Sequence, residues 1–594
     1  MGAGERVAEH AEDVVDYTMT ASLDPDAHTV AGNGVIHWRN TSQVPVRELW
    51  VHLYLNAFKN ERSAYLRERV GGRGSGDPEA FGSIDVQKLA LRVAGAPDAD
   101  LLPGVELHTT VGDEDETDAR VPLPRDVAPG EAIDLDVAFE DHLPVVIERT
   151  GYRGHFHMVG QWFPKLARLE PSGAWAHFPF HHLSEFYADF GTYDVTLDVP
   201  AAYTLGATGP AVESRLEGGR RIERHVQSDI HDFAWTAWDR WQSRRETIAG
   251  VAVTVLYPPG FDGIAERSLA SVRFALPHDE ERYGAYPYPV LTVVIPQDDA
   301  SEAGGMEYPT LITGDGPWYV PPELFVPEIV TVHELGHQWF YGLVATNEAA
   351  WPFLDEGLNQ YAETETMARW QGPGSASRLF GLPVGDAAIQ AVASQGAVHD
   401  EPVAQAASAF TTGRNYARLV YSRTAALMDT FARVYGDDGV TRALGAYARR
   451  YRFQHPGPDE FIRTMGEVLG EAAAKNLRVA LFDEGWVDYA VDSLGERAAV
   501  VRRRGTLAFP VDVDLVADNG APHRERWDGE GESHVVRWEG PGALRAVIVD
   551  PDRRVTLDAN PENNVYAPHG GAGAPRSLER AAYWTQLALE TIAP

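Results

Sequence analysis

The chain has 594 residues, of which 44% are hydrophobic and 10% aromatic, and its formal net charge at pH 7 is -36. This length exceeds what one hydrophobic core supports, and the composition is that of a folded protein. The acidic excess argues against nucleic acid and anionic membranes as partners, because phosphate binding needs clustered Lys and Arg. Since cysteine is absent, disulfides, thiolate zinc sites and cysteine nucleophiles are excluded.

The first residues, MGAGERVAEHAEDVV, contain neither a basic start nor an apolar run. We therefore expect no signal peptide in this chain, and no later run is long and apolar enough to span a bilayer. The expected protein is soluble. A signal removed earlier would leave the same sequence, so a cytoplasmic and a periplasmic or secreted location both stay open, as does the oligomeric state.

Residues 1–243 are predicted to form an N-terminal antiparallel β domain. Hydrophobic residues alternate with other residues along 49–55, 133–140 and 193–199. This period of two is typical of strands that bury one face.

Residues 244–498 are predicted to form a mixed α+β domain. Strands fit 251–257 and 290–295, and helices fit 327–342, 357–370, 416–435 and 459–469. In the first helix, Pro327 suits the opening turn and Gly342 the end. Period two returns along 499–568, which predicts a small β domain, and 569–594 reads as a glycine-rich linker with a C-terminal helix. The basic run 502–504 fits a solvated linker. The predicted fold class is therefore a multidomain α+β protein.

A five-residue pattern in the predicted helix 327–342 points to metal chemistry. His333 and His337 are four residues apart, so they lie on one helical face and can bind one cation. Glu334 lies one step round the helix and can reach a water on that cation, which suits a general base. The alternative is a helix that merely contains two histidines, since chance produces this pattern in about one such chain in twenty.

A catalytic zinc ion needs a third protein ligand. Glu356 follows His337 after eighteen intervening residues, at the start of the next predicted helix. Requiring glutamate at one fixed spacing makes coincidence about tenfold rarer. We therefore predict that His333, His337 and Glu356 bind zinc and that Glu334 is the general acid/base of a metallopeptidase.

This spacing resembles that of the gluzincin family that includes aminopeptidase N and the leukotriene epoxide hydrolase. The segments QWFPKL and HDFAW within residues 1–243 are similar to landmarks of the family's N-terminal β domain. The resemblance implies a thermolysin-like catalytic domain, a zinc cofactor and peptide substrates with a free N-terminus.

A glycine-rich segment upstream also resembles the family. Gly304, Gly305, Met306 and Glu307 match its glycine-x-methionine-glutamate-asparagine segment, with Tyr308 at the asparagine position. Glycine lets the backbone approach an extended substrate closely, and Glu307 would bind the substrate's α-ammonium group. The alternative is a glycine turn followed by an exposed glutamate.

Tyr421, with the basic Arg423 two residues later, resembles the family's tyrosine that donates a hydrogen bond to the oxyanion. The alternative is a tyrosine that packs within an amphipathic helix. Glu363 lies two turns beyond Glu356 and is predicted to orient a ligand imidazole, although it could be a solvated acid. Asp355 is expected to be solvated.

The predicted function is a zinc aminopeptidase that removes N-terminal residues from peptides. Two alternatives stay open. The same site would support an endopeptidase or an epoxide hydrolase, and the fold would support a noncatalytic binding scaffold. The side-chain preference for the first residue is not encoded in any motif of the sequence.

Overall fold

The computed structural model of the chain describes residues 7–69, 80–95, 97–107, 115–518 and 522–567. The chain divides into two compact units. The first comprises residues 1–349 and 448–455, and the second comprises residues 350–447 and 456–594. The predicted linker and helix at 569–594 lie outside the described residues.

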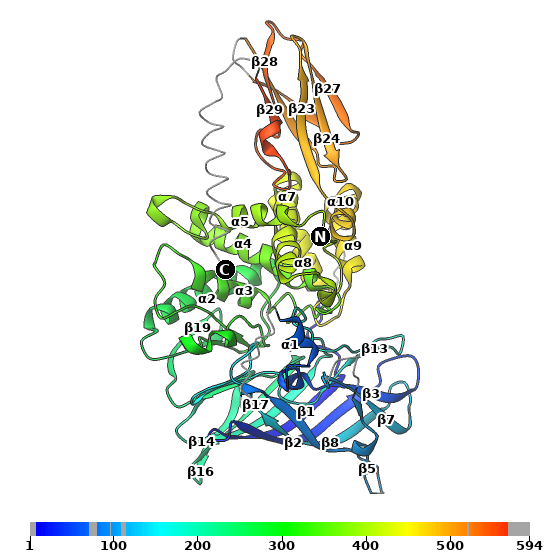
Figure 1. Cartoon of the computed structure of the whole chain (residues 1–594), viewed down its shortest axis with the longest axis vertical. Coiled ribbons are helices and arrows are strands. Elements are labelled where there is room, and N and C mark those ends of the chain that lie inside the picture. The colour runs from blue at the N-terminus through cyan, green and yellow to red at the C-terminus, as the bar shows by residue number, and fades with distance from the viewer. Residues whose placement is uncertain (1–6, 70–79, 96, 108–114, 519–521, 568–594) are drawn as a thin grey trace. The chain divides into compact units, whose positions relative to one another are not determined.

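The first unit begins with a large β sheet (Figure 1). Its strands are β1 (Val15–Asp24), β2 (Thr29–Arg39), β4 (Ser83–Leu91), β5 (Ala99–Asp100), β8 (Ala132–His142), β14 (Gly191–Pro200), β16 (Ala211–Glu217) and β17 (Arg220–Ile230). Their order in the sheet is β16-β17-β14-β1-β2-β8-β4-β5. The prediction of an antiparallel domain is wrong at one pairing, because β1 and β14 run parallel. The long segment between these two strands makes the required crossover possible.

Smaller sheets complete this β region. One has the order β15-β18-β10-β9, another β11-β3-β7-β6, and β12 pairs with β13. Their bounds are β3 (Val46–His52), β6 (Glu106–Leu107), β7 (Asp118–Val127), β9 (Gly151–Arg153), β10 (Phe156–Val159), β11 (Lys165–Leu166), β12 (Arg168–Leu169), β13 (Trp175–Ala176), β15 (Thr204–Ala207) and β18 (Trp235–Trp238). The run predicted as a strand over 49–55 ends early, because Tyr54–Phe58 form a 3-10 helix before the short helix α1 (Ala64–Glu68).

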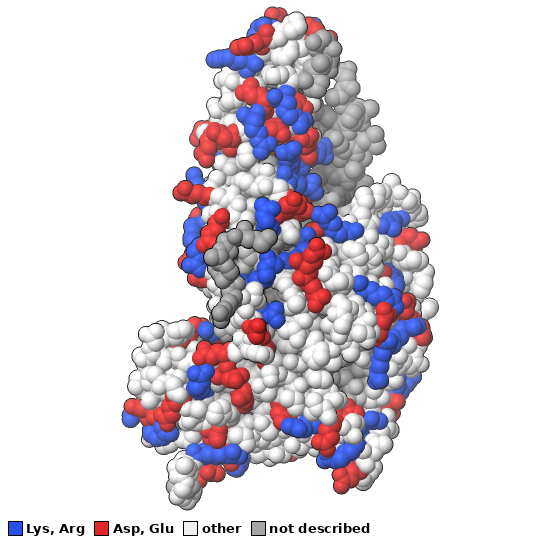
Figure 2. Space-filling view, turned by 180° about the vertical axis from the view of Figure 1, so that it is seen from behind, with Lys and Arg blue, Asp and Glu red and all other residues white. Residues whose placement is uncertain are grey.

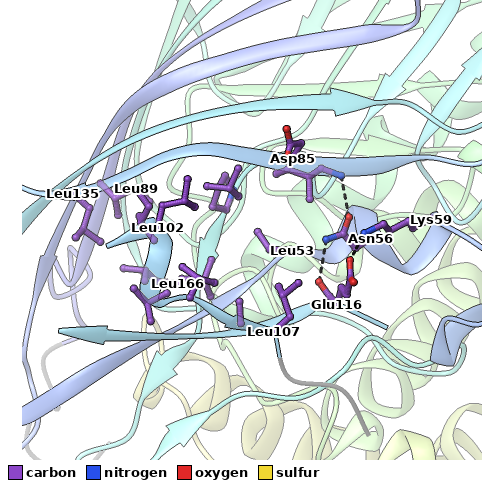
Figure 3. Close-up of a pocket in the computed structure, with 18 residues that line it drawn as sticks. Leu53, Asn56, Lys59, Asp85, Leu89, Leu102, Leu107, Glu116, Leu135 and Leu166 are labelled. Atoms are coloured by element: carbon purple, nitrogen blue, oxygen red, sulfur yellow. Dashed lines mark hydrogen bonds and ion pairs between the residues drawn. The ribbon is translucent and has the colours of Figure 1, made fainter. Parts of the chain in front are cut away.

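Aliphatic side chains from β2, β3, β4, β7 and β8 line a partly open pocket of about 290 Å³ (Figure 3). Leu89 and Leu135 line its apolar end. At the other end Asn56 donates a hydrogen bond to the backbone carbonyl of Glu116, and Lys59 forms an ion pair with the Glu116 side chain. Strands of the large sheet and of the β11-β3-β7-β6 sheet therefore line one pocket that has an apolar end and a polar end.

The segments QWFPKL and HDFAW pack against each other in this region. The Trp162 indole donates a 3.0 Å hydrogen bond to the carbonyl of Phe233. Lys165 and Asp232 form a 2.7 Å ion pair in which both side chains are 1% exposed. Burial lowers the pKa of Lys165, and the Asp232 carboxylate opposes this effect. The pair is thus an internal link between the two segments.

The first unit continues with a sheet of order β19-β20-β21-β22, formed by β19 (Gln242–Ile248), β20 (Val251–Tyr257), β21 (Val290–Val294) and β22 (Leu311–Thr313). The strands predicted at 251–257 and 290–295 are confirmed. Helices α2 (Asp262–Tyr283) and α3 (Val326–Gly336) pack on each other. The helix predicted over 327–342 is shorter than expected. The helix ends at Gly336, and in the segment that follows Tyr341 has a φ of 94° and Phe340 forms a bridge with Val344.

The second unit opens with helices, which are α4 (Glu356–Gln371), α5 (Asp386–Ala393), α6 (Gly413–Tyr416), η10 (Ala417–Arg423), α7 (Thr424–Tyr435), α8 (Asp437–Arg450), α9 (Pro458–Leu469) and α10 (Glu471–Phe482). The end of α8 belongs to the first unit. These elements confirm the helices predicted at 357–370, 416–435 and 459–469. The middle helix contains a π-helical segment, η10, that the sequence analysis did not predict.

Two small sheets follow, with orders β23-β24-β27 and β26-β25-β28-β29. Their strands are β23 (Val487–Leu494), β24 (Ala498–Gly505), β25 (Val511–Ala517), β26 (Pro522–Trp527), β27 (Ser533–Arg537), β28 (Leu544–Val549) and β29 (Val565–Tyr566). The basic run 502–504 lies in β24 and is not a linker. Arg502 pairs with Asp492 at 3.2 Å and Arg504 with Asp488 at 2.8 Å.

Acidic and basic side chains are interspersed on the face of the molecule shown in Figure 2. Among the described residues, no helix combines the length and the apolar character needed to cross a membrane.

Candidate metal centre and substrate site

Helix α3 is held firmly at its N-terminal end. Pro327 and Glu328 lie in its first turn, where a missing N–H and a negative charge are both favourable. The Glu328 carboxylate accepts hydrogen bonds of 2.7 and 2.6 Å from the guanidinium of Arg267 in α2. This bidentate pair ties the N-terminal end of α3 to α2, whereas His333 lies in the last turn of α3 and His337 directly follows the helix.

The two histidines of α3 converge. The Nε2 atoms of His333 and His337 are 3.2 Å apart. Nδ1 of His337 lies 3.2 Å from the carbonyl oxygen of Phe340, so a proton on Nδ1 leaves the Nε2 lone pair available. Two imidazole nitrogens on one tetrahedral zinc ion are about 3.3 Å apart, given zinc–nitrogen bonds of about 2.0–2.1 Å. The histidine pair therefore fits zinc.

Glu334 lies beside the glycine-rich segment. Its side chain is buried, and a Cβ atom at Gly305 would lie 3.8 Å from Glu334 Oε1. Gly305 has a φ of 68°, which disfavours any other residue at this position. Within the first unit, the structure thus brings together the predicted general base and the predicted substrate segment.

The glycine-rich segment extends the sheet that ends in β22. Gly305 N–H donates to the carbonyl of Thr313 at 2.9 Å, and Thr313 N–H donates to the carbonyl of Met306 at 2.8 Å. Glu307 follows and is only 2% exposed. One of its carboxylate oxygens lies within 4.8 Å of a ring nitrogen of His337. Glu307 Oε1 accepts no hydrogen bond from the part of the chain that the structure describes.

Gln338 joins α3 to this segment, a role that the sequence analysis missed. Its Oε1 accepts a 2.9 Å hydrogen bond from Thr310 N–H, and its Nε2 donates to the carbonyls of Glu307 and Tyr308 at 3.3 and 3.2 Å. Gln338, the residue directly after His337, therefore holds the backbone of Glu307 in a fixed position relative to the two histidines. Its position in the motif is the only sequence signal for this role.

Tyr308, at the family's asparagine position, is buried against the β region of the first unit. Its side chain is 1% exposed, and a Cβ atom at Gly160 would lie 1.9 Å from its hydroxyl oxygen. Burial raises the pKa of Tyr308 well above its ordinary value, so the phenol is neutral. The substitution is accommodated by a glycine that leaves space for the larger ring.

Glu356 lies in the first turn of α4, in the second unit, and is 3% exposed. Glu356 stays the predicted third ligand, which would add one carboxylate to the two imidazoles of His333 and His337 in the first unit. This is a donor set typical of catalytic zinc. The expectation that Asp355 is solvated is wrong, because Asp355 is 0% exposed.

A glycine lets α4 pack closely on the helix that carries Tyr421. A Cβ atom at Gly357 would lie 2.5 Å from the carbonyl oxygen of Val420 and 2.6 Å from Cβ of Thr424. Tyr421 itself lies in η10 and is half-buried. π-helical segments are frequent at functional sites, and the role of Tyr421 as a hydrogen-bond donor to the oxyanion stays a prediction.

Replacing Gly357 with alanine is expected to force α4 and η10 apart. Overpacking of this kind costs about 1–3 kcal/mol in unfolding free energy, and we expect zinc affinity and kcat to fall with it. Urea denaturation and zinc titration measure the two effects. Gly263→Ala in α2 is the matched control, because a Cβ atom there meets nothing within 4 Å. If the two variants have the same unfolding free energy and the same zinc affinity, the packing argument is wrong.

Arg423 anchors the other end of η10. Its side chain is 1% exposed and donates a hydrogen bond to the carbonyl of Gly485. Burial lowers the pKa of Arg423 to about 10, so the guanidinium still carries its charge at neutral pH. This contact fixes the segment in which Tyr421 lies.

Glu363 is buried in α4, which rules out the solvated alternative. The side-chain amide of Gln360 donates a hydrogen bond to it. Burial, and then the charge of Asp386, raise the pKa of Glu363 well above its ordinary value. Its role in orienting an imidazole stays a prediction.

The raised pKa of Glu363 predicts a pH effect on stability. A carboxyl group whose folded pKa is raised binds protons more tightly in the folded state, so it weakens the fold as pH rises above its unfolded pKa. Glu363→Gln removes this effect. We expect the unfolding free energy of the variant, relative to the wild type, to be higher at pH 8 than at pH 5 in urea titrations. A difference in unfolding free energy between variant and wild type that is the same at pH 5 and pH 8 would contradict the raised pKa of Glu363.

Residues 269–486 match the family model described as the Peptidase family M1 domain. The match runs from α2 to the residue before β23 and so includes the segment 304–307, the three predicted metal ligands and Tyr421. It confirms the predicted family resemblance. No curated protein matches the chain.

Proposed function

We propose that this chain, a zinc metallopeptidase of the aminopeptidase N kind by its Peptidase family M1 domain, removes single residues from the N-terminus of peptides. In this proposal His333, His337 and Glu356 hold the zinc ion. The substrate's free α-amine is bound by Glu307, so that the first peptide bond lies at the metal. The proposed partner is therefore a peptide with an unblocked N-terminus.

Each remaining side chain has one task in the proposed reaction. When bound, zinc supplies Lewis acidity to the scissile carbonyl and lowers the pKa of a water molecule. Glu334 accepts the proton of that water and returns it to the leaving amine. The hydroxyl of Tyr421 donates a hydrogen bond to the carbonyl oxygen as negative charge develops there, which is typically worth a few kcal/mol.

The environment of Glu307 is the main support for the proposal that the protein is an exopeptidase. Its carboxylate is 2% exposed, and its Oε1 accepts no hydrogen bond from the described residues. A buried carboxylate oxygen without a partner is unfavourable, and an ammonium group of the substrate would compensate it. Its closeness to His337 would place that ammonium about one residue from the metal.

Glu307→Gln tests the proposal. We expect kcat/KM for aminoacyl amides with a free amine to fall about 10- to 150-fold, because a charged hydrogen bond worth about 1.5–3 kcal/mol is lost. The N-acetylated amides, which we do not expect the wild type to cleave, should stay uncleaved by the variant.

The control for Glu307→Gln is Glu302→Gln, because Glu302 is exposed and pairs with Arg69 at 2.9 Å. Wild-type kcat/KM in Glu307→Gln would contradict the proposal. If the wild type cleaves blocked and free substrates equally fast, the endopeptidase alternative is correct.

A further inference from the structure

We propose that Arg149 is a positioning residue that holds the glycine-rich segment so that Glu307 is presented to the substrate's α-amine. The inference rests on the function proposed for Glu307 and adds a residue from the β region of the first unit to the specificity of the site. Arg149 itself does not bind the substrate, because a guanidinium repels an ammonium group.

Arg149 holds the segment at two points. Its Nε donates a 2.8 Å hydrogen bond to the carbonyl of Gly305, two residues before Glu307. Its backbone N–H donates a 2.7 Å hydrogen bond to the carbonyl of Glu302. The backbone on both sides of Gly304 is therefore tied to one residue of the β region.

The same guanidinium also binds a buried acid. Nη1 of Arg149 donates a 2.7 Å hydrogen bond to Glu185 Oε1, and the two side chains are 18% and 9% exposed. A planar guanidinium can reach the Gly305 carbonyl and the Glu185 carboxylate at once, whereas a lysine ammonium is a single point charge on a flexible stem. The geometry thus depends on arginine and not on positive charge alone.

Three acids keep Arg149 charged. Burial alone would lower its pKa, but Glu185, Glu148 and Glu307 raise it well above its ordinary value. The guanidinium donates hydrogen bonds to the Gly305 carbonyl and to Glu185. Oε1 of Glu307 accepts no hydrogen bond from the described residues, so Arg149 holds the segment without occupying that oxygen.

The backbone at Arg149 is strained. Glu148 and Arg149 are consecutive non-glycine residues with φ values of 41° and 63°, a conformation that such residues rarely adopt. Paired hydrogen bonds between Ile147 and Thr150, of 2.9 and 3.1 Å, close the turn around them. Strain of this kind persists only where the surroundings impose it, and it is concentrated at functional sites.

Inhibition by an amino-acid hydroxamate and by its N-acetyl derivative tests the inference. Both compounds carry the same metal-binding group, so the ratio of their Ki values isolates the contribution of the free amine. We expect the wild-type ratio to be large, and Arg149→Gln to reduce it about tenfold by raising only the Ki of the free-amine compound, since a charged hydrogen bond is lost. Arg149→Lys should also reduce it, because lysine cannot make both contacts.

The matched control is Arg153→Gln. Arg153 lies four residues away and pairs at 3.1 Å with Asp299, an exposed ion pair. We expect its Ki ratio to stay within twofold of the wild type. A wild-type ratio near one would overturn the role of Glu307 and this inference together. A large wild-type ratio that Arg149→Gln leaves unchanged would overturn the inference alone. A rise in both Ki values by the same factor, or a wild-type ratio in Arg149→Lys, would also overturn it.

Discussion

Glu334→Gln is expected to reduce kcat by at least about 10²–10⁴-fold, the usual contribution of a general base, while zinc stays bound. Glutamine has the size of glutamate but cannot accept the proton of the attacking water. Glu334 is buried, and its Oε1 lies near the Gly305 backbone. The Nε2 atoms that would bind zinc belong to His333 and His337, so replacing Glu334 leaves these two ligands in place. Metal analysis measures the bound zinc, and steady-state kinetics on an aminoacyl amide measure kcat.

Glu328→Gln is the control for this variant, because it changes the same residue type in the same helix. It should weaken the pair with Arg267 and lower the unfolding free energy by about 1–3 kcal/mol, yet keep kcat. Wild-type kcat in Glu334→Gln would show that another group moves the proton. Loss of zinc from Glu334→Gln would show that Glu334 supports the metal directly.

Glu356→Ala has the second large expected effect. Removal of a residue that merely supports a ligand weakens metal binding about 10–100-fold. We expect a larger loss of zinc affinity here, because only two of the three proposed protein ligands remain, and we expect kcat to fall in parallel. Zinc titration against a competing chelator measures the affinity.

Glu365→Ala is the matched control for the loss of a carboxylate from α4. Glu365→Ala removes a 2.8 Å ion pair between Glu365 and Arg369, which lies one turn after Glu365 in α4. We therefore expect no change in zinc affinity. If Glu356→Ala binds zinc as tightly as the control does, the third ligand is a different residue.

Local geometry explains which parts of the site could be predicted from the sequence. The spacing of His333 and His337 is a property of any α-helix, and the structure brings their Nε2 atoms to 3.2 Å. Glu356 begins α4 as expected, since the start of a helix can be identified from local sequence. The zinc chemistry and the family therefore follow from a few residues.

The residues that support the site were not predictable, because they depend on contacts between segments distant in the chain. Arg149 reaches Gly305 across more than 150 residues of sequence, and nothing in its own surroundings predicts that contact. Gln338 holds the Glu307 backbone, and its place directly after His337 is the only sequence signal for that contact. The parallel pairing of β1 with β14 is likewise decided by the route of the chain.

The ends of elements were also set by tertiary structure. The apolar periodicity after Gly336 suits a longer helix, but the chain leaves the helix to form the bridge between Phe340 and Val344. The π-helical turn at Tyr421 lies within a run that reads as a regular amphipathic helix. Close packing of Gly357 on Val420 is compatible with this irregular turn, and no local sequence signal marks it.

Hydrolysis of leucine amide and of N-acetyl-leucine amide by the complete chain tests the central claim most directly. The assay is run on the protein as purified, after removal of metal with a chelator, and after addition of one equivalent of zinc. We predict cleavage of the free-amine substrate alone, loss of that activity with the metal, and its recovery with zinc. Activity that survives complete removal of metal would contradict the claim that this protein is a zinc aminopeptidase, as would equal cleavage of both substrates.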